Sequence, residues 1–255
     1  MNNLIRFPLV VFAFAFFAMW FSARIGVFLR KKWRDREEDE RENLDLIIGA
    51  TLTLLGLLIG FSFSMAISRY DLRKNFEEAE ANAIGTEYVR ADFLPPADAV
   101  RVRTLLREYL DQRLLFYKTR DEHQRQKINA DTAQLQTGLW SAVRAPAAAQ
   151  PTPVLALTVS GMNDVLNSQG YTQSAWWNRI PIAAWGLMAV VAICANLLVG
   201  YTVRSPEAGL IRLVILPLIL CIAFFLIADI DSPRRGIIRV SPQNLMSLSE
   251  SLPGH

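Results

Sequence analysis

Four apolar stretches, each about twenty residues long, constrain this chain more than any other feature. They cover residues 7–28, 44–67, 180–201 and 210–230. A helix of this length crosses the ~30 Å hydrocarbon layer of a lipid bilayer. Apolar residues make up 52% of the chain, and the charges are gathered in blocks between the stretches, so the bilayer is the expected solvent. We therefore predict an all-α membrane protein with four transmembrane helices.

The first stretch has the position of a signal peptide, since it follows Arg6 near the start of the sequence. Its apolar run, VVFAFAFFAMWF, is long and lacks a small-x-small cleavage site. We expect it to be retained as a membrane helix. The charged connector that follows, RKKWRDREEDEREN, is expected to form a short solvated helix at the headgroup surface, with Trp33 as an interfacial aromatic.

A helical extramembrane domain is predicted between the second and third spans. The second span continues without a helix breaker until Pro95 and Pro96, and its extension carries apolar residues such as Phe76, Ile84 and Tyr88 at helical spacing. Further helices are predicted over 97–120, 121–143 and 154–166. The segment APAAAQPTP, with three prolines, is predicted to be a loop.

These patterns divide the chain into four parts. The first two spans and the charged connector occupy 1–68, the helical domain 69–178, the last two spans 179–231 and a tail 232–255. The tail carries Ile237, Ile238, Val240 and Leu245, and this apolar content favours docking on the helical domain over a free tail.

The second span, TLTLLGLLIGFSFSMAISRYD, is the most informative segment because it mixes glycines and hydroxyls into an apolar helix. Gly56, Gly60 and Ser64 repeat every four residues and form a stripe that lets another helix backbone approach closely. A neighbouring stripe is bulky. Its members are Leu57, Phe61 and Met65, with Thr53 one turn earlier. Spacing leaves two interpretations open: ordinary bundle packing, or a ring of subunits whose bulky stripes form a hydrophobic pore constriction.

The residues GFSFSMAISRYD, at 60–71, resemble the pattern of the bestrophin family, in which a Gly-Phe pair is followed at a fixed interval by Arg and an aromatic. The segments EANAIGTEYVRADFLP and LREYLDQRL resemble bacterial membrane proteins described as bestrophin-like. DIDSPRRG, after the last span, is similar to the acidic segment that follows the last bestrophin span. Arg69, Tyr70, Asp71, Asp229 and Asp231 are the membrane-exit residues that this resemblance marks, with an expected role between subunits.

The resemblance implies a homo-oligomer, a pentamer in this family, whose second helix lines an axial pore for small anions such as chloride. Leu57 and Phe61 match the hydrophobic neck. Thr53 stands where a bulkier apolar residue is expected, which departs from a tight seal. The calcium-binding acidic clasp of the animal proteins is not recognisable here, so calcium gating is not expected.

Other classes of function receive no support from the sequence. Cys194 and Cys221 lie within apolar stretches, basic residues are interleaved with acids, and common catalytic motifs are missing. We therefore expect no enzyme activity, no metal, no cofactor and no nucleic-acid partner. Lysine and arginine counts do not decide the orientation, and the resemblance implies a bacterial inner-membrane protein with cytoplasmic domain and termini. The alternative function is a non-conducting scaffold or sensor whose helical domain binds a soluble partner.

Overall fold

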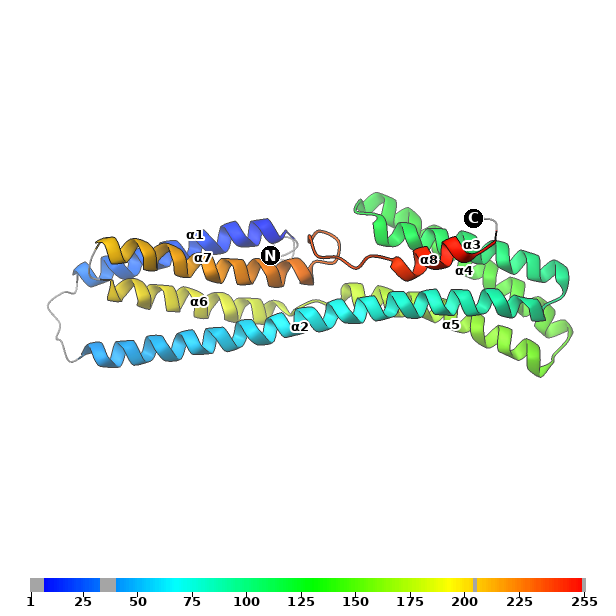
Figure 1. Ribbon diagram of the computed structural model, residues 1–255, viewed down its shortest axis with the longest axis horizontal. Coiled ribbons are helices and arrows are strands. Elements are labelled where there is room, and N and C mark those ends of the chain that lie inside the picture. Colours follow the sequence, from blue (N-terminus) through cyan, green and yellow to red (C-terminus); the bar gives the residue numbers. More distant parts are fainter. Residues whose placement is uncertain (1–6, 33–39, 204–205, 254–255) are drawn as a thin grey trace. The chain divides into compact units, whose positions relative to one another are not determined.

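The computed structural model describes residues 7–32, 40–203 and 206–253, and this part of the chain is helical without any strand (Figure 1). The helices are α1 (Pro8–Lys32), α2 (Glu40–Arg90), the short 3₁₀ helix η1 (Ala91–Phe93), α3 (Pro96–Lys118), α4 (Glu122–Ala149), α5 (Pro153–Trp177), α6 (Ile182–Thr202), α7 (Pro206–Asp231) and α8 (Gln243–Ser251). The predicted all-α class is confirmed. Residues 33–39 of the predicted connector helix, which include Trp33, lie outside the described residues.

Four helical runs are long and apolar enough to cross a membrane. They are Pro8–Lys31, Leu44–Phe93, Pro153–Thr202 and Leu213–Asp231. Each predicted apolar stretch overlaps one of these runs over nearly all of its length. The prediction of four transmembrane helices is therefore confirmed.

The chain divides into two compact units, and α2 contributes to both. Unit 1 contains residues 1–70 and 179–239, which include all four apolar stretches. Unit 2 contains residues 71–178 and 240–255.

Two glycines bring the backbones of α1 and α6 into direct contact in unit 1. A Cβ atom on Gly200 would lie 2.0 Å from the carbonyl oxygen of Ala23, and one on Gly26 would lie 2.1 Å from that of Leu197. The Ser22 hydroxyl also donates to the Ile193 carbonyl at 2.7 Å. Small residues and hydroxyls are the usual means by which membrane helices pack closely, because lipid supplies no hydrophobic drive for their association.

The helix α4 is longer than predicted, and the predicted loop APAAAQPTP is mostly wrong. The helix continues through Pro146 to Ala149, leaving only Gln150 to Thr152 before α5 begins at Pro153. Pro146 is buried, and its carbonyl still accepts the N–H of Gln150 at 3.0 Å. A proline this close to a helix end removes one backbone bond, and the alanines that follow it are the strongest helix formers. Helix α5 also continues past 166, to Trp177.

The helix α8 lies in unit 2, where a buried carboxylate holds its first turn. Glu77 of α2 accepts the backbone N–H of Leu245 at 2.9 Å and the side-chain amide of Asn244 at 2.7 Å. Val240 and Leu245 are buried, whereas Ile237 is 77% exposed. An acceptor at the first N–H groups of a helix satisfies donors that have no partner inside it.

We predict that Gly200→Ala destabilises the protein, because the added methyl group collides with backbone atoms that have no rotamer to change. The expected loss is about 3 kcal/mol, at the upper end of the cost of overpacking. The measurement is chemical unfolding of the purified protein in detergent. Gly49→Ala is the matched control, since its Cβ would meet no described atom within 4 Å; equal midpoints for the two variants would contradict the close crossing.

Candidate functional site

The bulky stripe of α2 lies on a face that no other part of the described chain covers. Leu57 is 54% exposed, Phe61 67% and Met65 38%, and Thr53 is also exposed. The Thr53 hydroxyl donates to the Gly49 carbonyl at 2.8 Å, so its hydrogen is used within the helix. The four side chains therefore form an uncovered stripe along the helix.

The small-residue stripe lies beside it and is equally open. Gly56, Gly60 and Ser64 are exposed, and a Cβ on either glycine would meet no described atom within 4 Å. No helix of the described chain packs on this stripe. Ordinary packing within one subunit, one of the two interpretations of the spacing, thus has no support among the described contacts.

The opposite face of α2 packs into unit 1. Leu55, Ser62 and Ala66 are at most 4% exposed, and Phe63 and Tyr70 pack against the same core. In the most apolar window of α2 only 11% of the residues are buried, against 22–50% in the other three candidate spans. Among these spans, α2 is the one that its own chain covers least.

An aspartate at the end of the membrane spans joins two helices and the segment before a third. Asp231, the last residue of α7, accepts the N–H of Ile180 with both oxygens at 3.2 Å. Its carboxylate also lies 3.7 Å from Nη1 of Arg69 on α2. Asp231 therefore connects the end of α7 to α2 and to the residues just before α6.

The second aspartate, Asp229, fixes the turn after α7. It accepts the N–H groups of Ile237 and Ile238 at 2.7 and 2.8 Å. Gly236 is required in this turn because a Cβ there would lie 2.2 Å from the Asp229 carbonyl oxygen. Both aspartates are thus engaged by their own chain, and the described residues contain no cluster of three or more metal-ligating side chains. Of the other predicted exit residues, Tyr70 is partly buried and Asp71 is exposed.

Charged side chains occupy the buried face of α2 in unit 2, and the sequence patterns missed them. Glu80 pairs with Arg113 of α3, and neither side chain is exposed. Thr172 of α5 and Tyr117 of α3 donate to the same carboxylate at 3.1 and 3.4 Å. A buried ion pair with these added hydrogen bonds fixes the arrangement of α2, α3 and α5. Glutamates spaced along a helix usually indicate a solvated face, and no local pattern identifies a partner 33 residues away.

One buried carboxylate has no hydrogen-bond partner among the described residues. Glu87 of α2 is fully buried, and both of its oxygens are unpaired. It lies against Gly161 of α5, where a Cβ would sit 2.1 Å from Oε2. Burial raises the pKa of Glu87 to about 8; the charge of Arg90 opposes this shift and that of Asp164 adds to it.

Known sequences and structures identify the kind of protein to which this arrangement belongs. The Bestrophin-like domain matches residues 9–245, which is nearly the whole chain. The chain belongs to the Bestrophin-like family. No curated protein sequence matches it significantly.

The bestrophin-like chain also shares its fold with solved structures. A bacterial bestrophin homologue from Klebsiella pneumoniae aligns with a TM-score of 0.64 and 13% identity, covering 94% of this chain and 99% of the homologue. A mutant of that homologue gives 0.64 and 14%, with 93% and 98% covered. A membrane protein variant gives 0.63 and 12%, also with 93% and 98% covered. At these low identities, the TM-scores establish a common fold alone.

The contacts of Asp231 with Ile180 and Arg69, here called the Asp231 clamp, predict that the folded protein loses stability when the charge of Asp231 is removed. Asp231→Asn removes the charge facing Arg69 and weakens the acceptor for Ile180, for an expected cost of about 1–3 kcal/mol. The unfolding midpoint in detergent measures it. Asp45→Asn, at an exposed position of α2, should leave the midpoint within about 0.5 kcal/mol of wild type. A shift of similar size in both variants would show that Asp231 acts only through general charge.

The raised pKa of Glu87 predicts that the stability of the protein depends on pH, and that the substitution Glu87→Gln removes this contribution. Since its pKa is raised on folding, the stability that the protonated side chain contributes is complete below the ordinary value of 4.5. It is lost as the pH rises to about 8 and above. Melting temperatures of Glu87→Gln and wild type should agree at pH 5, and the variant should melt higher at pH 9. Exposed Glu78→Gln is the control; parallel pH profiles for wild type and Glu87→Gln would refute the assignment.

Proposed function

We propose that this bestrophin-like chain is one subunit of a homo-oligomeric channel for small anions such as chloride, with α2 lining an axial pore. The observation that carries the proposal is the asymmetry of α2. One face packs into the core of unit 1, while the face with Leu57, Phe61 and Met65 stays open within the subunit. Five such helices around an axis, the number that the family resemblance implies, would turn these side chains toward one another.

Apolar side chains control such a pore through its hydration. A narrow ring of Leu57 and Phe61 would exclude water when closed, and an ion would have to shed its hydration to pass. Thr53 would form a wider level one turn away. Gly56, Gly60 and Ser64 would then allow the neighbouring subunit's helix to approach closely.

The remaining parts of the proposal concern setting and partners. The protein would act in the bacterial inner membrane with unit 2 and the termini in the cytoplasm, and without enzyme activity. Arg69, Tyr70, Asp71, Asp229 and Asp231 would form the membrane exit close to the neighbouring subunit. The contacts of Asp231 with Arg69 and Ile180 support this role because they hold the membrane exit of α2 in a fixed position.

The proposal predicts that Phe61→Ala raises anion flux. Removing the phenyl groups lowers the free-energy barrier that dewetting of the pore imposes on an ion. We expect the flux to rise about tenfold, which corresponds to a barrier lowered by about 1.4 kcal/mol. Chloride efflux from vesicles containing purified protein measures this effect.

Phe21→Ala provides the matched control. Phe21 is 62% exposed on the membrane-spanning α1, similar to Phe61, yet the proposal places it away from the pore. Its flux should equal that of wild type. Absence of chloride flux with wild type and both variants, or equal changes in the two variants, would contradict the assignment of α2 as the pore helix.

A further inference from the structure

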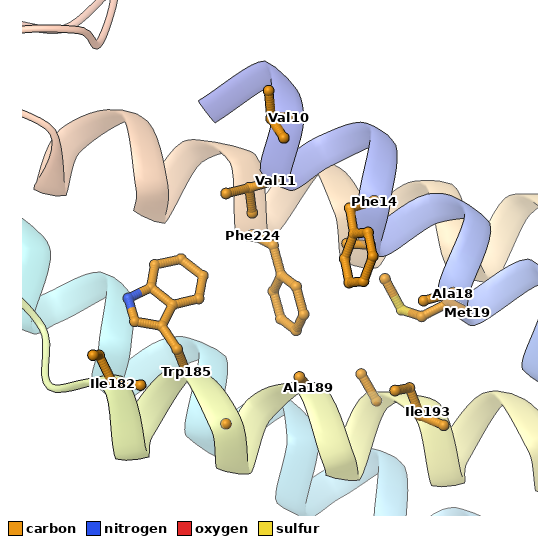
Figure 2. Close-up of a pocket in the computed structure, with 13 residues that line it drawn as sticks. Val10, Val11, Phe14, Ala18, Met19, Ile182, Trp185, Ala189, Ile193 and Phe224 are labelled. Carbon is orange, nitrogen blue, oxygen red and sulfur yellow. The ribbon is translucent and has the colours of Figure 1, made fainter. Parts of the chain in front are cut away.

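Unit 1 contains an apolar groove between α1 and α6, closed at its base by Phe224 of α7 (Figure 2). Its volume is about 240 Å³, and none of its lining side chains is charged or carries a hydroxyl or amide group. Phe14 at the rim is 75% exposed and Val10 is 41% exposed, so the groove opens away from the core. A cavity of this composition does not hold water, because water needs polar partners.

A buried polar group with no acceptor lies at one end of this groove. Trp185 lines the groove and is only 8% exposed, yet its indole N–H has no acceptor among the described residues. Figure 2 shows the indole nitrogen on the side of the ring away from Phe224 and close to Ile182, the first residue of α6. The nitrogen itself is inaccessible, so Trp185 presents its aromatic ring, and not its N–H, to an occupant of the groove.

A cation lies near the same end of the groove. The Arg235 guanidinium stacks 4.1 Å from the ring centroid of Phe7, the residue immediately before α1. The Phe7 carbonyl accepts the N–H groups of Val10 and Val11, and both valines line the groove. The Arg235 side chain is exposed and is therefore available to an anion outside the groove.

We propose that the groove binds one anionic glycerophospholipid, an assignment that does not depend on channel activity. An acyl chain fills the space between Phe14, Ala189 and Phe224. The lipid's phosphate lies on Arg235. The groove is smaller than the roughly 300–1,000 Å³ of pockets for drug-sized ligands, which suits a single hydrocarbon chain.

Fluorescence quenching by bromine-labelled lipids tests the proposal on the full-length protein. Wild type and Trp185→Phe are placed in mixed vesicles of phosphatidylcholine and phosphatidylglycerol, with bromine on the acyl chains of one lipid at a time. The difference between the two proteins isolates the emission of Trp185. We expect quenching by brominated phosphatidylglycerol to exceed that by brominated phosphatidylcholine by about fivefold at equal mole fraction. This factor corresponds to about 1 kcal/mol for one arginine at an anionic surface.

Two pairs of variants separate headgroup binding from chain binding. Arg235→Gln should reduce the fivefold preference to one, whereas Arg24→Gln, which removes an arginine stacked on Trp20, should preserve it. Gly186→Leu places a side chain in the groove and should abolish quenching by both lipids. Leu187→Phe adds bulk at an exposed neighbouring position and should not. Melting temperatures confirm that each variant is folded.

Two results would overturn the proposal. If the two brominated lipids quench Trp185 equally, in wild type and in Arg235→Gln alike, the groove contacts bulk lipid without selecting a headgroup. No quenching of Trp185 by either lipid in the assembled protein would mean that a second copy of the chain covers the groove. If Gly186→Leu fails to fold, the Arg235 pair decides alone.

Discussion

The hydrocarbon layer of a membrane supplies no hydrogen-bond partner to a peptide group, and this constraint determines the architecture of unit 1. Each span must satisfy its backbone internally, so each is a helix. Because lipid is as apolar as leucine, the apolar side chains themselves give little reason for the helices to associate. The contacts that hold unit 1 together are therefore specific: the glycine crossing at Gly26 and Gly200, the Ser22 hydroxyl, and the Asp231 clamp at the membrane exit.

The helix α2 meets two different environments along its length and uses a different kind of contact in each. In unit 1 its buried face is small and apolar, with Leu55, Ser62 and Ala66. In unit 2 its buried face carries three glutamates. Glu77 accepts the N–H of Leu245 in the tail, Glu80 pairs with Arg113, and Glu87 has no hydrogen-bond partner among the described residues. Replacing apolar packing by buried charge costs stability but restricts which partners fit, since a charge without its counterpart is penalised heavily.

The sequence was a good guide wherever length and hydropathy decide the structure. Four spans followed from four apolar stretches, and Pro95 and Pro96 correctly marked the end of the long helix. The prediction of a loop at APAAAQPTP was mostly wrong because composition does not show that a proline in the last turn of a helix removes only one backbone hydrogen bond. The stripes on α2 were visible as spacing, but their exposure depends on where α1, α6 and α7 lie. Buried charges such as Glu80 and Arg113 escaped notice because their partners are distant in sequence, and spaced glutamates usually face solvent.

The most direct test of the pore assignment is the symmetry of the purified full-length protein, imaged by cryo-electron microscopy in detergent or lipid discs. The account predicts a five-fold ring in which α2 surrounds the axis, with Leu57 and Phe61 directed inward and α1 on the outside. A monomer, a dimer, or a ring in which α2 faces lipid would contradict it, and would leave the exposed face of α2 as a surface for some other contact.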